Sequence, residues 1–307
     1  MRILHLLGVM ELSVGELAQA VGQSQPRVSR HVKILAEADL LDRRKEGNWV
    51  FVRLASSRAC QKLMGMVADI PAESSEGLWL KADLARLAAI RAERVRAADS
   101  YFAAHAEQWD ALGSLYVPEA EVDQAVLRAL GDERFSYLLD LGTGTGRMIA
   151  LLGQSATQVS AIDRSPDMLR LARAKLPPES ADRVDLLLGD FCALPLDDAS
   201  ADLVTAHQIL HYSATPHLAI AEAARVLKPG GRILIVDFAP HDREELRSRD
   251  QHERLGFSDE QIGEWFAEAG LELEQTDTLP GGELTVKLWL GRRKSANILT
   301  IKERKTS

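Results

Sequence analysis

Between residues 136 and 238, short apolar segments alternate with stretches of helical periodicity. The strand-like segments span residues 137–141, 158–162, 184–188, 201–206 and 232–238, and the helical ones 145–154, 166–174 and 216–227. Strands and helices that alternate in this order build a parallel sheet with helices on both faces. Two further strand-like runs, 271–278 and 284–290, meet at Pro280-Gly281-Gly282 and predict a final hairpin. The fold class is therefore α/β, with a doubly wound, Rossmann-like sheet of seven strands.

A glycine-rich loop follows the first of these strands and opens the next helix. It reads Asp140-Leu141-Gly142-Thr143-Gly144-Thr145-Gly146-Arg147. Glycines let a backbone turn sharply and approach a ligand without an intervening Cβ. The spacing is G-x-G-x-G, whereas the dinucleotide fingerprint has its third glycine one residue later. Taken alone, such a loop is often only a turn.

Carboxylates at the ends of the next two strands strengthen the case for a cofactor site. Asp163 ends the second strand, where a carboxylate can accept hydrogen bonds from ribose hydroxyls. Gly189-Asp190-Phe191 ends the third, where Asp190 could accept from an adenine amine and Phe191 could flank the ring. Each aspartate could instead cap the helix that follows it. Helix capping does not explain polar groups at three consecutive strand ends, so a ligand site is the better interpretation.

The first 70 residues differ in charge from the remainder of the chain. They hold 10 Lys/Arg and 7 Asp/Glu, whereas the whole chain has a net charge of −8. A basic head on an acidic body is the asymmetry expected where only the head meets a polyanion.

The same region has the sequence pattern of a winged helix-turn-helix. Ser13-Val14-Gly15-Glu16 is a capping box that opens a helix ending at Gly22, and Ser24 caps a second helix. Two β-prone runs, 40–45 and 49–54, follow around a turn at Glu46-Gly47-Asn48 and predict a hairpin, the wing. A helix at residues 56–69 closes the unit.

Basic and polar side chains of the second helix and the wing are candidate contacts with double-stranded DNA. Val28, Val32 and Leu35 share one helix face, so Arg30 and Lys33 fall on the other. The N-terminal part of such a helix enters the major groove, and a wing can grip a nearby phosphate. The candidates are Ser24, Gln25, Arg27, Ser29, Arg30, His31, Lys33, Arg43, Arg44 and Lys45. The alternative is a solvated charged face, but the order of helix, turn, basic helix and basic hairpin favours DNA binding.

These residues resemble the ArsR family of winged-helix repressors. The similar runs are Glu11–Ala18, Ser24–Leu35 and Arg43–Val50. The resemblance implies a homodimer that releases DNA when a ligand binds. Metal-sensing members have cysteines in the helix matching residues 11–17, where this chain has Ser13 and Gly15, so we expect no metal site there. The family's first helix is also missing, so we expect dimerisation through residues 56–112, or a true start upstream.

The region from residue 95 to 292 resembles class I S-adenosylmethionine (SAM)-dependent methyltransferases. Beyond the loop, the shared motifs include Ser165–Leu169, Leu194–Leu196, Asp202–Val204, His207–Tyr212 and Glu222–Arg232. The resemblance implies that Asp140, Gly142, Gly144 and Gly146 bind the methionine moiety of SAM. It further implies that Asp163 binds the ribose, Met168 one adenine face, and Asp190 with Phe191 the adenine edge.

Polar residues after the fourth and fifth strands are placed to meet a methyl acceptor. Among Gln208, His211, Tyr212 and His241, we predict His211 as the general base. The alternative is that these residues merely line a wet cleft mouth. Arsenic methylation is not expected, because Cys192 alone cannot replace the several cysteines that arsenic binding requires.

The expected domains are 1–69 (winged helix), 70–112 (linker and helical connection), 113–293 (methyltransferase) and 294–307 (disordered tail). Three roles are possible for residues 78–112: a spacer, a dimerising helix pair, or a cap over the cofactor pocket. Two cysteines and no long apolar span indicate a cytoplasmic protein away from membranes. We predict a DNA-binding regulator that also methylates a small molecule. A non-catalytic sensor of SAM or S-adenosylhomocysteine (SAH) is the alternative, and an enzyme whose winged helix only recruits partners is a third.

Overall fold

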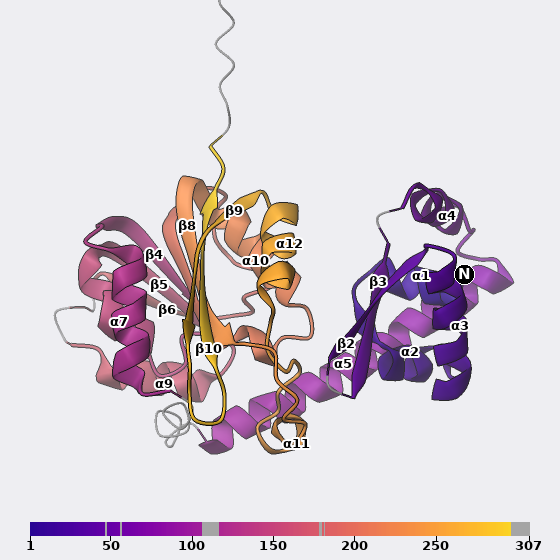
Figure 1. The fold of residues 1–307 in the computed structure, drawn as a ribbon, viewed down its shortest axis with the longest axis horizontal. Coiled ribbons are helices and arrows are strands. Elements are labelled where there is room, and N and C mark those ends of the chain that lie inside the picture. The colour runs from indigo at the N-terminus through magenta and orange to yellow at the C-terminus, as the bar shows by residue number, and fades with distance from the viewer. Residues whose placement is uncertain (47, 56, 106–116, 178–179, 181, 296–307) are drawn as a thin grey trace, which may run out of the picture. The chain divides into compact units, whose positions relative to one another are not determined.

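A computed structural model describes residues 1–46, 48–55, 57–105, 117–177, 180 and 182–295 (Figure 1). The chain forms two compact units. Unit 1 comprises Met1–His105, His211–Thr215 and Pro240–Gly256, and unit 2 comprises Ala106–Leu210, Pro216–Ala239 and Phe257–Ser307. Two segments that lie deep in the C-terminal half of the sequence therefore belong to the unit that holds the N-terminus.

Unit 1 has the predicted winged-helix architecture. Its elements are α1 (Arg2–Leu7), β1 (Leu12–Ser13), α2 (Val14–Val21), α3 (Gln25–Glu37), β2 (Leu41–Glu46), β3 (Trp49–Leu54), α4 (Arg58–Ala68), α5 (Ser75–His105) and α11 (Glu245–Arg249). Strands β1, β3 and β2 form an antiparallel sheet in that order. The two-residue strand β1, which extends the wing into three strands, and the short helix α11 were not predicted.

Local sequence signals explain where the helices of the helix-turn-helix begin and end. The Ser13 hydroxyl accepts from the Glu16 N–H (3.2 Å), and the Glu16 carboxylate accepts from the Ser13 N–H (2.8 Å), which completes the capping box. Gly22 ends α2 with a φ of 64°. Helix α3 then turns Val28 and Val32 into the core of the unit, where both are fully buried.

The N-terminal part of α5, which falls in the predicted connection 70–112, belongs to the core of unit 1. Asp83, fully buried, forms ion pairs with Arg2 (2.6 Å) and with Arg86. Arg2 and Arg86 also donate to the carbonyls of Val21 and Ala20 at the end of α2. This network holds α1, α2 and α5 together. Residues 106–112 of the predicted connection and residues 113–116 of the predicted methyltransferase domain lie outside the described residues, as do residues 296–307 of the predicted tail.

Unit 2 contains a seven-stranded sheet, which confirms the predicted Rossmann-like fold. The strands are β4 (Phe135–Leu141), β5 (Ala156–Asp163), β6 (Val184–Leu188), β7 (Ala201–His207), β8 (Leu227–Phe238), β9 (Leu271–Leu279) and β10 (Val286–Arg293). Their order is β6-β5-β4-β7-β8-β10-β9. The first five are parallel, and β10 pairs antiparallel with both β8 and β9. The order reverses beside β4, the position at which open α/β sheets bind ligands.

Helices cover both faces of this sheet. Helices α7 (Glu119–Leu130) and α9 (Pro166–Lys175) lie on one face, and α10 (Pro216–Val226) and α12 (Asp259–Glu268) on the other (Figure 1). The short helices α8 (Arg147–Leu152) and η2 (Gly153–Ser155) connect β4 to β5, and η4 (Leu210–Tyr212) follows β7. The central strands are buried, with Leu139, Ile162, Val204 and Ile235 each at most 1% exposed.

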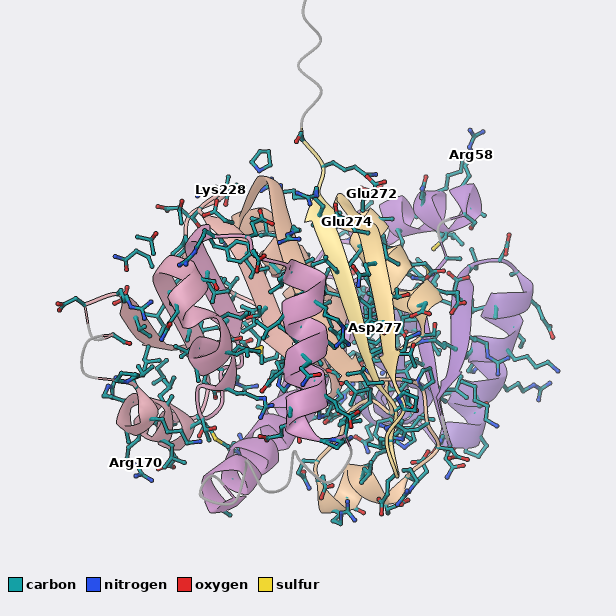
Figure 2. All side chains as sticks on the ribbon, turned by 60° about the vertical axis from the view of Figure 1, so that its left-hand side comes forward. Arg58, Arg170, Lys228, Glu272, Glu274 and Asp277 are labelled. Atoms are coloured by element: carbon teal, nitrogen blue, oxygen red, sulfur yellow. The ribbon has the colours of Figure 1, made fainter. Side chains whose placement is uncertain are left out.

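The outer strand β9 carries acidic side chains along its length. Glu272, Glu274 and Asp277 project from it (Figure 2), and Glu274 and Asp277 form ion pairs with Arg292 and Arg128. Charge on an edge strand disfavours pairing with another chain. Separately, no helix within the described ranges has both the length and the apolar composition needed to cross a bilayer.

Candidate cofactor and nucleic-acid sites

The loop between β4 and α8 depends on its glycines. Gly142, Gly144 and Gly146 have φ angles of 61°, 54° and 89°, which lie in the left-handed region that L side chains rarely adopt. A Cβ on Gly142 would also lie 2.2 Å from Cγ1 of Ile209. Conformation thus disfavours a side chain at all three glycines, and at Gly142 the side chain of Ile209 also fills the space, so the loop has no Cβ atom at these three positions.

Asp163 fixes this loop against β5. Its two carboxylate oxygens accept from the N–H groups of Gly144 and Ser165, both at 2.8 Å. The Thr143 N–H donates to the carbonyl of Ile162 (3.0 Å). Burial raises the pKa of Asp163 above its usual range, and the hydrogen bonds to the carboxylate partly offset this rise. The Arg164 N–H donates to this carboxylate as well. A carboxylate has about four acceptor sites, so one is left for a ligand hydroxyl.

Asp140 lies inside the sheet beneath the loop. It is 1% exposed, and its Oδ1 accepts from the Thr205 hydroxyl at 2.7 Å. Burial raises the pKa of Asp140 to about 7, against the lowering effect of that hydrogen bond. The carboxyl group therefore changes charge near neutral pH, and a cation bound beside it would favour the ionised form.

The remaining predicted cofactor residues occupy different environments. Asp190 is exposed just beyond β6, and its Oδ1 accepts from the Cys192 N–H at 2.8 Å. The neighbouring Gly189 N–H donates to the carbonyl of Asp163 (2.9 Å), which keeps the ends of β5 and β6 together. Phe191 (7% exposed) belongs to the core of unit 2, and Met168 (2% exposed) is buried in α9. The structure thus brings Asp140, Asp163 and the loop together, with Asp190 at the adjacent strand end.

These residues fit an adenosine-containing cofactor. The loop offers backbone without Cβ atoms, the end of β5 offers a carboxylate with free acceptor capacity, and the end of β6 offers an exposed carboxylate. Strand ends at a topological switch point are the general location of such sites.

The predicted base, His211, is buried and belongs to unit 1. It is 2% exposed, and its ring lies 4.0 Å from that of Tyr212 and 4.3 Å from that of His252. His241 lies 6.5 Å from His252. Burial and the neighbouring His211 and His241 lower the pKa of His252, which is therefore neutral. His252 was not among the residues predicted from the sequence. Across the described residues, no group of three or more metal-ligating side chains could hold a metal ion.

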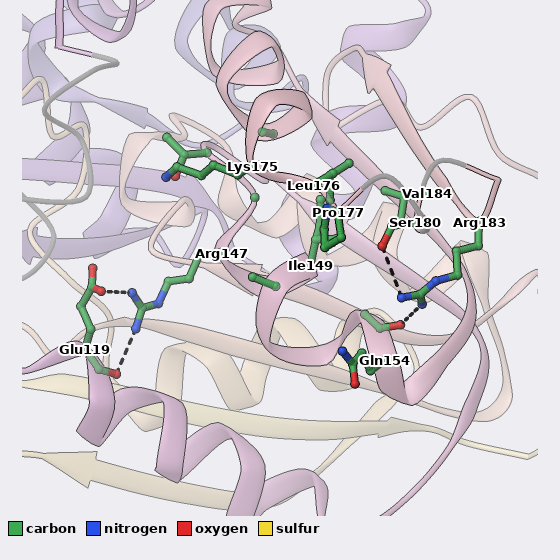
Figure 3. Close-up of a pocket in the computed structure, with 15 residues that line it drawn as sticks. Glu119, Arg147, Ile149, Gln154, Lys175, Leu176, Pro177, Ser180, Arg183 and Val184 are labelled. Atoms are coloured by element: carbon green, nitrogen blue, oxygen red, sulfur yellow. Dashed lines mark hydrogen bonds and ion pairs between the residues drawn. The ribbon is translucent and has the colours of Figure 1, made fainter.

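A pocket of about 230 Å³ lies between α8 and α9 in unit 2 (Figure 3). Gly146 lines it, but Asp140, Asp163 and Asp190 do not. Its two arginines are engaged by protein groups: Arg147 by Glu119 and Asp123, and Arg183 by the carbonyl of Gly153. This pocket therefore adjoins the cofactor loop without containing its carboxylates.

Helix α3 presents its predicted DNA contacts to solvent. Seven of the candidate side chains are exposed, namely Ser24, Gln25, Arg27, Ser29, Arg30, His31 and Lys33. Lys33 also lies 3.8 Å from Glu37, one turn further along. The helix thus has one apolar buried face and one polar face free to meet a partner.

The three basic residues of the wing do not share one face of the sheet. Arg43 and Lys45 are exposed, whereas Arg44 lies opposite Phe51 in the β2–β3 register and is partly buried. Arg44 forms an ion pair with Glu11 at 3.4 Å. Alternation along β2 explains the difference, since neighbouring side chains point to opposite faces.

A groove of about 360 Å³ runs between α2, α3 and the wing. Gln25, Ser29 and Arg43, three of the predicted DNA contacts, line it. Asn48 and Trp49 of the wing and Gly15 at the start of α2 also line it and were not predicted. Their adjacency depends on the turn between β2 and β3, which sequence spacing alone does not reveal.

Comparison with protein families agrees with a chain that has an N-terminal winged helix and a Rossmann-like sheet after it. A model of the methyltransferase-domain family matches residues 139–235, and a model of the MarR family matches residues 1–48. The N-terminal match is thus to the MarR family rather than to the ArsR family that the sequence motifs resemble.

Individual relatives match the methyltransferase part. An uncharacterized methyltransferase of Mycobacterium tuberculosis is 39% identical over 150 residues, which is 49% of this chain and 54% of that protein. A demethylmenaquinone methyltransferase of Clavibacter sepedonicus is 40% identical over 115 residues, 38% of this chain and 46% of that protein. The chain thus spans about half the length of the curated relatives it matches.

Solved structures agree on the fold. A chain from the Haloferax volcanii complex of the Trm112 methyltransferase activator with a methyltransferase aligns with a TM-score of 0.54 and 25% identity, covering 63% of this chain and 97% of its own. A Bacillus halodurans structure described as a methyltransferase aligns with a TM-score of 0.51 and 20% identity, covering 57% of this chain and 100% of its own. The protein therefore combines a methyltransferase domain of Rossmann-like fold with an N-terminal winged helix.

Proposed function

We propose that this protein is a DNA-binding transcriptional regulator whose second unit binds SAM and methylates a small molecule. The observation that carries the cofactor half is the pairing of Asp163 with the bare glycine loop at the switch point of the sheet. The methyltransferase-domain match and the named relatives support the same activity.

In this proposal the chain's own residues align the reactants. SAM supplies a methyl group activated on a sulfonium, so the protein's main task is positioning. The loop glycines and Asp140 hold the methionine moiety, Asp163 holds the ribose, and Asp190 with Phe191 and Met168 contacts the adenine. His211 would have to gain access to the acceptor to act as a general base, because it is 2% exposed.

The DNA-binding half rests on α3 and the wing. Exposed Arg27 and Arg30 suit guanine edges or phosphates, and the exposed Arg43 and Lys45 suit phosphates. The family model that matches residues 1–48 is that of the MarR family, so the closer resemblance of the sequence motifs to ArsR regulators is only a part of this proposal. A homodimer, the usual state of such regulators, would present two copies of α3 to a palindromic operator.

Selection of bound fragments from a random DNA library would test the proposed DNA binding. Incubation with labelled SAM and a metabolite extract would test the proposed methyl transfer. The proposal expects an enriched palindrome and labelled small molecules. Enrichment without labelling would favour the non-catalytic sensor instead. In that case SAM or SAH should still change affinity for the enriched DNA, because intact cofactor residues serve both functions.

A further inference from the structure

The outer face of the wing carries two aromatic side chains. In β3, Val50 and Val52 face the core of the winged helix, and Val52 is fully buried there. Because side chains alternate along a strand, Trp49 and Phe51 point to the opposite face. Phe51 is nevertheless only 4% exposed, so another part of unit 1 covers this face.

Residues 240–256, which we call the cover segment, supply that surface within unit 1. The guanidinium of Arg247 lies 4.3 Å from the ring centre of Trp49, and that of Arg254 lies 3.9 Å from that of Phe51. Arg254 is fully buried and pairs with Glu11 at 2.9 Å. Glu11 also pairs with Arg44 of the wing, so one carboxylate joins a cation of the cover segment to a cation of β2.

The cover segment also occupies the tip of the wing. The Glu244 carboxylate accepts a hydrogen bond of 2.5 Å from the backbone N–H of Asn48. Backbone N–H groups are ordinary ligands of DNA phosphates, so the Glu244 carboxylate occupies a donor of the kind that phosphates use. Arg247 holds that carboxylate in place, with Nε 3.2 Å from Glu244.

The ends of the cover segment connect it to the catalytic half of the chain. The segment begins just after β8, and the Phe257 N–H beyond its end donates to the carbonyl of Phe238 (2.9 Å). Within unit 1, the N–H groups of Glu253 and Arg254 donate to the carbonyl of His211, which follows β7. The segment thus follows β8 in the chain, ends just before Phe257, and is hydrogen-bonded to His211 within unit 1.

We propose that the cover segment is an autoinhibitory device that competes with DNA for the wing. This inference rests on the proposed DNA-binding function. When seated, the segment fills the phosphate position at Asn48 and fixes Arg44 through Glu11. DNA binds fully only to molecules whose cover is released. If about nine molecules in ten have the cover seated, apparent DNA affinity is about tenfold weaker than that of the released state.

Arg247→Ala in the full chain provides the test, with Arg249→Ala as its matched control. Both remove one positive charge from α11, but Arg249 is 54% exposed and pairs with Asp250. Removing a positive charge ordinarily weakens DNA binding. Autoinhibition predicts the opposite for Arg247→Ala: a five- to tenfold gain in DNA affinity, measured by fluorescence anisotropy. It predicts no gain for Arg249→Ala. Equal or weaker binding by folded Arg247→Ala would overturn the inference.

Glu244→Gln, compared with Glu245→Gln, provides a second test should Arg247→Ala not fold. Glu245 is 51% exposed and pairs with Arg243, so the charge change is the same. Only Glu244→Gln should increase the affinity for DNA. An equal increase in both variants would show that the lost negative charge alone explains the effect, and would overturn the autoinhibition. If replacing Arg27 or Arg30 weakens DNA binding but the cover variants bind DNA with the affinity of the unmodified protein, only this inference fails. If no variant binds any selected DNA, the proposed function fails as well.

Discussion

The carboxylate of Asp163 accepts a hydrogen bond of 2.8 Å from the backbone N–H of Gly144. The residue proposed to bind ribose therefore also shapes the loop proposed to hold the methionine moiety. This double role ties two parts of one ligand to a single side chain, and it explains why a carboxylate at this strand end is tolerated despite its raised pKa.

Asp163→Ala should abolish both roles. Hydrogen bonds to charged groups contribute about 1.5–3 kcal/mol each, so we expect SAM affinity in calorimetry to fall by at least tenfold. Asp163→Asn keeps one acceptor oxygen and should lose less. SAM binding by Asp163→Ala at the affinity of the unmodified protein would show that the cofactor lies elsewhere.

Gly142→Ala should destabilise unit 2, because a Cβ there meets Ile209 Cγ1 at 2.2 Å and the φ is 61°. Overpacking typically costs about 1–3 kcal/mol, and a left-handed non-glycine residue adds about 1–2 kcal/mol. Urea unfolding should therefore show a large loss of stability. Adding Ile209→Ala should recover the steric part relative to Ile209→Ala alone, but not the backbone part.

Gly263→Ala is the matched control for that experiment. Gly263 lies inside α12 with nothing within 4 Å of its ideal Cβ position. Alanine there should be neutral or stabilise by about 0.5–1 kcal/mol. An equal effect of alanine at both positions would contradict the steric argument for Gly142.

Strand periodicity and turn residues were enough to predict the seven-stranded sheet, whereas contacts distant in sequence were not predictable. Val28 and Val32 disclosed the buried face of α3 through their spacing. No spacing reveals that Arg254 pairs with Glu11, because 243 positions separate them. Similarly, Met168 and Phe191 follow family motifs, yet only the packed structure shows that both are buried. Helix α12 was not predicted, although Ser258 caps it.

The raised pKa of Asp140 predicts a pH dependence of stability. The folded protein retains this proton up to a pH of about 7, whereas the unfolded chain loses it near 3.8. The stabilising contribution is therefore complete below the unfolded value and disappears as the pH rises through about 7. The free energy of unfolding of the ligand-free protein should fall between pH 5 and pH 8, and Asp140→Asn should flatten this part of the profile.

SAM binding should show the opposite trend over the same range. The ammonium of a bound methionine moiety favours an ionised Asp140, so affinity should rise from pH 5.5 to pH 7.5. Calorimetry across that range would measure it, with Asp140→Asn as the control that lacks the titrating group. A flat profile in the unmodified protein would remove Asp140 from the cofactor site.

Replacing Arg27 or Arg30 by alanine should weaken DNA binding by about 1–3 kcal/mol if the arginine reads a base edge, because alanine cannot donate to guanine. Arg58→Ala is the matched control, because Arg58 is an exposed arginine on α4, outside α3 and the wing (Figure 2). Anisotropy titrations at fixed salt would compare the three variants. If Arg58→Ala weakened binding as much as the α3 variants, nonspecific charge would explain the affinity and α3 would not be the reading helix.

Cofactor and DNA should influence each other's binding by the same factor. Thermodynamic linkage requires that, if SAH changes the affinity for DNA by a given ratio, saturating DNA changes the affinity for SAH by that ratio. Typical couplings are about 5- to 150-fold, within reach of anisotropy and calorimetry. If the coupling acts through the cover segment, Arg247→Ala should shrink this ratio toward one, and its SAH affinity without DNA should move to the value that saturating DNA gives the unmodified protein. A ratio of one in the unmodified protein would mean that its two units work independently.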